Sequence, residues 1–191
     1  ARLALPVLGV RLDVDGLDRL PDDSCVVVAN HASYLDGIAL FAALPVPFSF
    51  VAKREFLDHP VARAYLRGLG AQFVERFDTL QSAQAAWRLA EVVKAGTSMA
   101  FFPEGTFGRM PGLSPFRLGA FAAAVAAGVA VAPVAVRGTR AMLRDGDWLP
   151  RRGTIAVTIG SPVFPGVPGG DAFAQAVALR DAARAQILAH C

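Results

Sequence analysis

The chain has 191 residues, of which 54% are hydrophobic and 18% charged, and its formal net charge is +3. Its mean hydropathy of +0.42 is high for a soluble protein but far below that of a multi-span membrane protein. So small a basic excess, without a nucleic-acid-binding motif, argues against a nucleic-acid partner and fits an anionic lipid, a phosphorylated cofactor or an acidic carrier protein. The two cysteines, Cys25 and Cys191, build no disulfide framework and indicate a reducing, cytoplasmic compartment.

Short apolar runs alternate with helical patterns along the chain, without an internal repeat. The sequence predicts strands at residues 7–14, 25–29, 48–52, 72–75, 99–102, 129–136 and 154–159. It predicts helices at residues 34–43, 61–66, 80–95, 116–127 and 172–189. In the third helix, Ala83, Trp87, Ala90 and Val93 recur at helical spacing, and Gly96 ends the pattern. The alternation predicts a single layered α/β domain over residues 1–191, with a mostly parallel or mixed central sheet and helices on both faces.

One apolar stretch, residues 118–136, carries no charge and has the length of a bilayer span. Gly119, Gly128 and Pro133 interrupt it, however, and alanine and valine make up most of the rest. We therefore interpret it as a helix that stops at Gly128, followed by a buried strand, rather than as a membrane span.

A histidine and an aspartate follow the apolar run 25–29. His31 and Asp36 are five positions apart, so in a continuous helix they would not share a face. They can meet if His31 lies in the turn before a helix and Asp36 in its first turn, with Ser33 as the N-cap. The carboxylate would then orient the imidazole and stabilise the imidazolium formed on proton uptake. The alternative is that Ser33 and Asp36 form a capping box and that His31 is structural.

A second polar cluster, Pro103-Glu104-Gly105-Thr106, follows the predicted strand 99–102. Its glycine allows the backbone to approach a ligand, and Thr106 and nearby amides can donate hydrogen bonds. The alternative is an ordinary turn that ends the strand and leaves Glu104 exposed. In α/β sheets, ligand sites lie beyond the carboxyl ends of strands, and both clusters fall there.

The motifs of other reaction centres are missing from the sequence. It contains no Gly-x-Ser-x-Gly elbow, no His-Glu-x-x-His or Cys-x-x-Cys metal spacing and no Gly-x-x-x-x-Gly-Lys phosphate loop. Because the only histidines are His31, His59 and His190, no metal site is expected. A histidine base without a protein nucleophile indicates direct transfer. His31 would deprotonate a substrate hydroxyl, which attacks an activated acyl group such as a thioester.

Basic side chains near the strand ends are the candidate anion-binding groups. They are Lys53, Arg54, Arg76, Arg109 and Arg117. A looser set could face a membrane or water, and consists of Arg137, Arg140, Arg144, Arg151 and Arg152. For any one of them, the alternative is a solvated surface charge.

These motifs resemble those of the glycerolipid acyltransferase family over most of the chain. The family's His-x4-Asp motif falls on His31 and Asp36. The other blocks are similar to residues 51–56 with 70–76, 102–106 and 131–136. The resemblance implies that His31 is the general base and Asp36 its orienting partner. It also implies that acyl-CoA or acyl-carrier protein is the donor, a co-substrate rather than a cofactor.

The acceptor implied by the resemblance is a lysophospholipid or a glycerol phosphate. Its phosphate would be held by the turn Glu104, Gly105 and Thr106 together with Lys53, Arg76 and Arg109. The sequence departs from the family in one place, because many members continue Glu-Gly-Thr with Arg-Ser, whereas this chain has Phe107-Gly108-Arg109. The departure bears on the acceptor and not on the reaction class, and Arg76, Lys53 or Arg109 would compensate for it.

We therefore expect an O-acyltransferase of phospholipid biosynthesis whose acceptor is 1-acylglycerol 3-phosphate and which binds peripherally to the cytoplasmic face of the cell membrane. The alternatives are a thioesterase, in which the same histidine activates water, and a catalytically silent lipid-binding domain that recruits a protein to membranes. The sequence leaves little room for the N-terminal hydrophobic helices by which some members dock. The chain is thus expected to be an acyltransferase domain that belongs to, or is cut from, a larger protein with a fused or partner domain.

Overall fold

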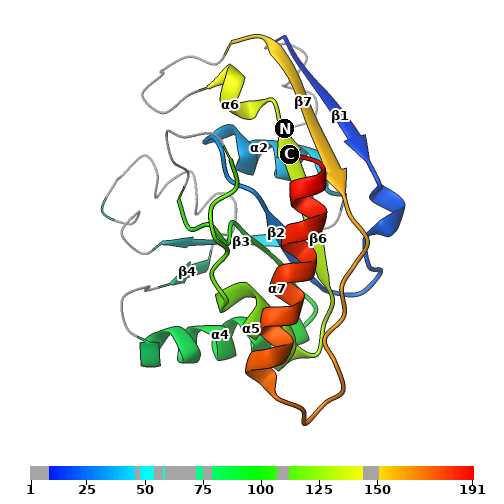
Figure 1. The fold of residues 1–191 in the computed structure, drawn as a ribbon. Helices are drawn as coiled ribbons and strands as arrows, with labels where there is room; N and C mark the ends of the chain where they lie inside the picture. Colours follow the sequence, from blue (N-terminus) through cyan, green and yellow to red (C-terminus); the bar gives the residue numbers. More distant parts are fainter. Residues whose placement is uncertain are drawn as a thin grey trace.

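The computed structural model describes residues 9–45, 48–53, 58, 72–74, 79–106, 112–143 and 151–191. The strands are β1 (Val10–Asp15), β2 (Val26–Ala29), β3 (Phe48–Lys53), β4 (Gln72–Val74), β5 (Ser98–Phe101), β6 (Val131–Arg137) and β7 (Gly153–Ile159) (Figure 1). The helices are α2 (Leu35–Ala43), α4 (Thr79–Lys94), α5 (Gly119–Ala127), α6 (Thr139–Met142) and α7 (Ala172–Ala189), with a short 3-10 helix, η1 (Leu17–Arg19). The predicted helix 61–66 lies outside the described residues.

The described strands form one seven-stranded sheet in the order β1-β7-β6-β2-β5-β3-β4. Neighbouring strands run parallel except β6 and β7, which are antiparallel. β2 lies in the middle, where Val27 pairs with Ala100 of β5 on one side and Ala132 of β6 on the other. A strand enclosed in this way should be apolar throughout, and all four residues of β2 are buried. The prediction of a mostly parallel or mixed sheet is confirmed.

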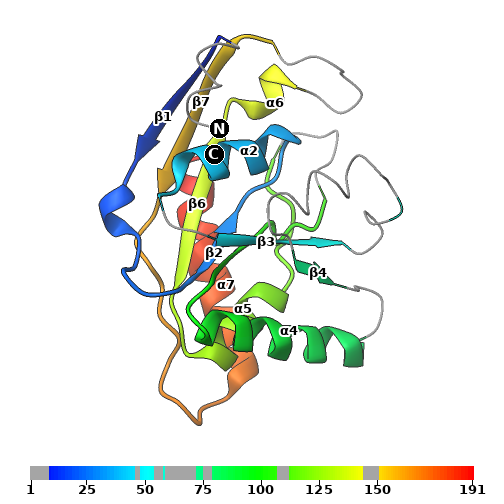
Figure 2. The same ribbon diagram turned by 180° about the vertical axis from the view of Figure 1, so that it is seen from behind.

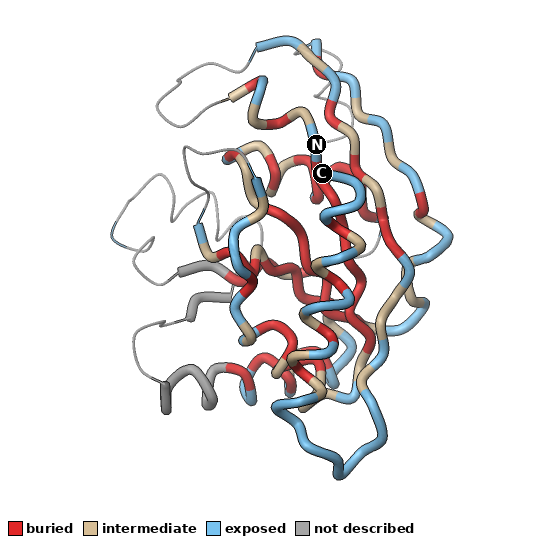
Figure 3. The backbone as a smooth tube through the Cα atoms, viewed as in Figure 1, coloured by how far each residue is buried: buried red, intermediate tan, exposed pale blue. Residues whose placement is uncertain are grey.

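Helices cover both faces of the sheet, as predicted. α2 and the short α6 lie on one face, and α4, α5 and α7 lie on the other (Figures 1 and 2). Val27 and Ala29 point into the core beneath α2, whereas Val26 and Val28 point into the core on the opposite face. Burial is concentrated in the central strands and the inner sides of the helices (Figure 3). The two cores enclose the central strands, and a site can form at the carboxyl ends of these strands.

The apolar stretch 118–136 folds as a helix followed by a strand, which confirms the interpretation from the sequence. α5 ends at Gly128, whose φ of 71° lies in the left-handed region that favours glycine. The N–H of Gly128 donates to the carbonyl of Val125 (3.1 Å) and that of Val129 to Ala124 (3.1 Å), a Schellman motif. β6 follows directly. Of the helices in the described ranges, none has the length and apolarity of a bilayer span.

Three details differ from the sequence prediction. The helix expected from residue 116 starts at Gly119, and the N–H of Arg117 before it donates to the carbonyl of Pro103 (2.9 Å). On α4, Trp87 is 61% exposed, and the buried side is formed by Ala86, Leu89, Ala90 and Val93. The helix α6 was not predicted, since its four residues are too few to show a periodicity.

Candidate active site

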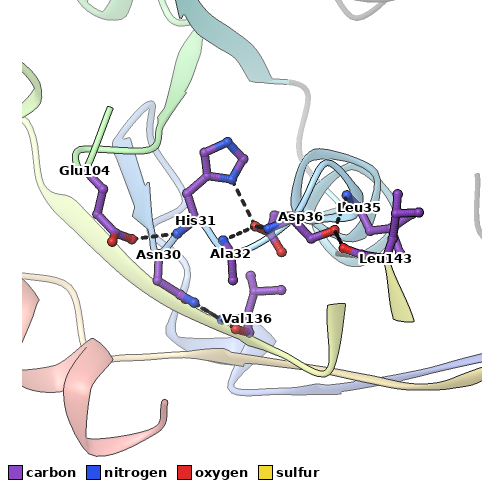
Figure 4. A network of polar contacts seen from close by, with 9 residues as sticks. Asn30, His31, Ala32, Leu35, Asp36, Glu104, Val136 and Leu143 are labelled. Atoms are coloured by element: carbon purple, nitrogen blue, oxygen red, sulfur yellow. Dashed lines mark hydrogen bonds and ion pairs between the residues drawn. The ribbon is translucent and has the colours of Figure 1, made fainter. Parts of the chain in front are cut away.

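The ends of β2 and β5 bring the two predicted polar clusters together. β2 ends at Ala29 and β5 at Phe101, and the parallel pairing makes the segments after them leave the sheet at the same end. There the carboxylate of Glu104 accepts a hydrogen bond from the backbone N–H of His31 (2.7 Å; Figure 4). Residues far apart in the sequence thus share one site beyond the carboxyl ends of the central strands.

His31 and Asp36 meet across the start of α2. His31 lies in the turn after β2 and Asp36 in the first turn of α2, and the His31 Nδ1 is 2.9 Å from the Asp36 Oδ2 (Figure 4). An ionised carboxylate only accepts hydrogen bonds, which assigns the proton to Nδ1 and the lone pair to Nε2. Nε2 points away from Asp36, and the side chain of His31 is 18% exposed. This nitrogen therefore has the position and the tautomer that a general base requires.

Asp36 holds the turn as well as the imidazole. The side chain is fully buried, and its Oδ2 also accepts from the backbone N–H groups of Ala32 (2.6 Å) and Ser33 (2.8 Å). The bond to Ser33 is one half of a capping box, so capping and orientation of the imidazole coexist in one carboxylate. Its second oxygen, Oδ1, has no hydrogen-bond partner within the described part of the chain.

The structure places the N-cap of α2 one residue after Ser33, the residue that the sequence predicted. The N-cap position is occupied by Tyr34, in a helical conformation and without a side-chain capping bond. The Ser33 hydroxyl still accepts from the N–H of Leu35 in the first turn of α2 (3.2 Å), as a capping side chain does, and it donates to the carbonyl of Leu143 (2.8 Å). These bonds tie the start of α2 to the residue that follows α6. Because Leu143 lies 110 positions further along the chain, no local pattern predicts this contact.

Two residues to which the sequence analysis gave no role support His31. The Asn30 carboxamide donates to the carbonyl of Val136 (2.9 Å) and accepts from its N–H (2.7 Å), so a side chain extends the pairing of β2 with β6. The ring of Phe102 stacks on the imidazole, with the centroids 4.2 Å apart and the planes at 17°. Their positions in the sequence could have marked both residues as part of the site, since Asn30 directly precedes His31 and Phe102 directly precedes the Pro-Glu-Gly-Thr turn.

Glu104 is buried, which excludes the exposed turn that was the alternative for its cluster. Its Oε1 accepts from the N–H of His31, and its Oε2 accepts from the N–H of Ser114 (2.8 Å). Gly105 follows with a φ of 85°, a conformation that favours glycine. The carboxylate therefore joins three segments, namely the turn after β5, the turn that carries His31 and the loop before α5. Thr106 is exposed at the end of this segment.

Of the predicted anion-binding side chains, only that of Arg117 is described, and it is exposed. Lys53 is the last residue of β3, whose parallel pairing with β5 places it at the same end of the sheet as His31, but its side chain is not among those described. Arg76 and Arg109 also fall outside the described ranges. Their roles remain predictions.

The structure offers no second reaction centre among the residues it describes. Burial raises the pKa of the Cys25 thiol, and a hydrogen bond with the Ser98 hydroxyl only partly opposes this shift. The thiol is thus protonated at neutral pH and unsuited to nucleophilic attack. Within the same ranges, no three His, Cys, Asp or Glu side chains gather in a metal-binding group.

Comparison with known proteins gives the family of this chain. The family model described as Acyltransferase matches residues 11–137, a span that includes His31, Asp36 and Glu104. The chain belongs to the glycerolipid acyltransferase family. It is 34% identical over 157 residues to the chloroplastic 1-acyl-sn-glycerol-3-phosphate acyltransferase BAT2 of Brassica napus, which covers 81% of this chain and 45% of that relative. The 1-acyl-sn-glycerol-3-phosphate acyltransferase of Pseudomonas aeruginosa is 32% identical over 170 residues, covering 88% and 65% of the two chains.

A solved acyltransferase has the same fold. The crystal structure of PlsC, the 1-acyl-sn-glycerophosphate (LPA) acyltransferase of Thermotoga maritima, matches with a TM-score of 0.78 at 27% identity, covering 98% of this chain and 73% of that one. The α/β fold expected from the family resemblance is therefore confirmed. The chain spans only about half the length of several relatives that it matches, 45% of the Brassica protein among them.

In this member of the family, we expect Glu104→Gln to reduce both stability and any turnover. The glutamine oxygen can still accept one backbone N–H, but the amide NH2 would face the other donor, so either the His31 or the Ser114 bond is lost. The loss of a buried bond to a charged group should lower the free energy of unfolding by about 1–3 kcal/mol. Denaturant unfolding and steady-state kinetics of the same preparation would measure the two effects.

Glu91→Gln is the matched control, because the side chain of Glu91 is exposed and pairs with Lys94 on the surface of α4 (3.0 Å). Surface pairs of this kind contribute about 0–1 kcal/mol, so little change is expected. If Glu104→Gln left stability unchanged and raised only the KM for the acceptor, Glu104 would be a substrate-contacting group rather than a buried tie between segments.

Proposed function

We propose that this chain transfers a fatty acyl group from an acyl thioester to a hydroxyl of a lysophospholipid, with 1-acylglycerol 3-phosphate as the preferred acceptor. The observation that carries the proposal is the His31–Asp36 pair at the end of β2, with Nδ1 bonded to the carboxylate and Nε2 directed away from Asp36. The names of the relatives from Brassica napus and Pseudomonas aeruginosa supply the acceptor.

The proposed reaction is direct transfer. As the acceptor oxygen attacks the thioester carbonyl, its proton moves to the His31 Nε2, and the Asp36 carboxylate stabilises the imidazolium through Nδ1. The tetrahedral intermediate then expels the thiolate, which takes the proton from Nε2. The C–S bond breaks, a C–O ester bond remains, and the imidazole returns to its starting tautomer. No metal or redox group is required by this balance.

The acceptor phosphate is proposed to lie near the turn that follows β5. The positive charge is supplied by Lys53, Arg76 and Arg109. Gly105 lets the backbone approach the phosphate, and Thr106 supplies a hydroxyl. Glu104 holds the turn in place rather than contacting the phosphate, because both of its oxygens are bonded to backbone N–H groups and a second anion would be repelled. The acyl transfer is proposed to take place at the cytoplasmic surface of a membrane, where the lipid substrates are found.

Arg76→Ala is expected to weaken the use of a phosphate-bearing acceptor. A buried charge-assisted hydrogen bond is worth about 1.5–3 kcal/mol, which corresponds to a fall in kcat/KM of roughly 10- to 100-fold. The matched control is Arg88→Ala, since Arg88 is exposed on α4. Unchanged kcat and KM for the acceptor would remove Arg76 from the site, and Phe107 would then point to a different kind of acceptor.

Thiol release from palmitoyl-CoA and oleoyl-CoA, measured against a panel of lysophospholipids, tests the proposed function. Release that depends on 1-acylglycerol 3-phosphate and yields the diacyl product is the expected result. Release without any acceptor would indicate a thioesterase. Vesicle binding without release of thiol from either donor would indicate a lipid-binding domain.

A further inference from the structure

The outward side of α2 is an apolar surface next to the catalytic pair. Tyr34 and Phe41 are 61% and 46% exposed, and Ile38 between them is partly exposed. The spacing of these residues (i, i+4 and i+7) places them in one stripe on the helix. The only charged residue of α2 is Asp36, which is fully buried on the opposite side. A helix that is apolar on all sides is normally enclosed, whereas this one shows an uncharged stripe to its surroundings.

Arginines lie on and next to α6, the helix that contacts α2. α6 packs beside α2, and the Ser33–Leu143 hydrogen bond joins the two (Figure 2). Arg140 lies on α6, and the N–H of Arg151 donates to the carbonyl of Met142 in α6 (2.8 Å). Both Arg151 and Arg152 are exposed. The described residues 137–143 and 151–153 contain four arginines and no carboxylate.

We propose that the stripe of Tyr34, Ile38 and Phe41, with the arginine rim of Arg140, Arg151 and Arg152, binds the surface of an anionic lipid bilayer. An apolar helix side that inserts at the boundary between headgroups and acyl chains, with basic residues beside it, is the pattern of interfacial binding. The aromatic rings suit the boundary region, and the arginines pair with lipid phosphates. An acidic carrier protein would match the rim but leaves the uncharged stripe without a role.

The placement of this surface has a consequence for catalysis. The inference rests on the proposed acyl transfer, in which both substrates carry fatty chains. His31 precedes Tyr34 by three residues, so a bilayer that contacts the stripe lies close to the catalytic pair. An amphiphilic acceptor could then reach the Nε2 of His31 with its hydroxyl while its acyl chain stays among the lipids.

Vesicle co-sedimentation of the full chain tests the apolar stripe. Phe41→Gln is expected to bind vesicles of phosphatidylcholine and phosphatidylglycerol about tenfold more weakly, because a phenylalanine side chain no longer enters the bilayer. The matched control is Phe173→Gln, since Phe173 is 68% exposed but lies in the first turn of α7, at the far end of the molecule from α2 (Figure 1). This control should bind as the parent chain does. Equal losses in both variants would overturn the proposal.

The arginine rim is tested in the same assay. Arg151→Gln with Arg152→Gln should weaken binding to the anionic vesicles by roughly 25-fold, about fivefold per arginine, and should leave binding to pure phosphatidylcholine unchanged. High salt should remove the difference from the parent chain. Arg88→Gln with Arg180→Gln, which removes the same charge from α4 and α7, is the control. Parent-like binding of the rim variant would overturn the proposal.

An insertion measurement covers the case in which a variant misfolds. Phe41→Trp should give additional fluorescence that brominated lipids quench, and Phe173→Trp should not. If the stripe variants bound vesicles normally but lost activity only with acyl-carrier protein as donor, the surface would be a carrier-protein site and the bilayer proposal would be wrong. His31→Ala separates the two proposals, because it should bind vesicles normally. Failure of acyl transfer with intact, stripe-dependent vesicle binding would reject the proposed function and leave the docking surface standing.

Discussion

His31→Ala is expected to lose nearly all acyl transfer while the protein stays folded. An alcohol is too weak an acid to attack a thioester quickly unless its proton is removed as the new bond forms, and a positioned base contributes about 10²–10⁴-fold. The backbone N–H of His31 keeps its bond to Glu104 in this variant, so the turn after β2 retains a main anchor. Thiol release with acceptor present, together with thermal unfolding, would measure activity and folding separately.

His190→Ala is the matched control for the loss of an imidazole. His190 is exposed at the C-cap of α7, and the substitution should leave acyl transfer at the parent level. Full activity in folded His31→Ala would reject the general-base mechanism altogether. A loss of both folding and activity would be resolved by His31→Gln, which keeps a polar side chain of similar reach against Asp36 but cannot act as a base at neutral pH.

Elements with a strong local signal were predictable from the sequence. α7 matches the predicted span 172–189 in full, because Asp171 caps its start through the N–H groups of Phe173 and Ala174. The break at Gly128 was predictable for the same reason, since a left-handed glycine ends α5 before the apolar run continues as β6. The spacing of His31 and Asp36 allowed only one way for them to meet, and the structure has that arrangement.

Features that depend on the register of distant strands were not predictable. The partner of the Asn30 side chain is Val136, 106 residues away, and their pairing exists only because β6 lies beside β2. Glu104 followed a pattern typical of an exposed turn, yet it is buried, because His31 lies 73 residues away in sequence and beside it in space. Local propensity cannot predict these contacts, because they form only when distant strands pair in the sheet.

Asp36→Asn is expected to lower kcat by about 10- to 100-fold, less than the loss of the base itself. Three N–H groups, from Ala32, Ser33 and the His31 Nδ1, converge on the Asp36 Oδ2. An amide NH2 in that place would face two backbone donors, so the asparagine oxygen should stay there and His31 should keep its proton on Nδ1. What is lost is the negative charge facing the imidazolium, about 1.5–3 kcal/mol for a charge-assisted bond.

The same substitution should also cost stability, because the new NH2 occupies the position of the buried Oδ1. In the described part of the chain the Asp36 Oδ1 has no hydrogen-bond partner, so we expect the new NH2 to be unsatisfied, and an unsatisfied buried donor costs about 1–3 kcal/mol. Denaturant unfolding measures the loss of stability. The kcat under saturating donor and acceptor measures the effect of the lost charge on catalysis.

Asp171→Asn separates capping from catalysis. Asp171 accepts two backbone N–H groups at the start of α7, as Asp36 does before α2, but it has no histidine beside it among the described residues. The Asp171→Asn variant should therefore keep full acyl transfer. It should lose at most a small part of the stability that the cap of α7 contributes. Near-normal transfer by folded Asp36→Asn would mean that Asp36 serves only as a cap. A fall in kcat of about 10⁴ is the effect of the equivalent change where it reverses the histidine tautomer. Such a fall in Asp36→Asn would mean that the asparagine NH2 faces His31 and that the three converging donors do not decide the orientation of the amide.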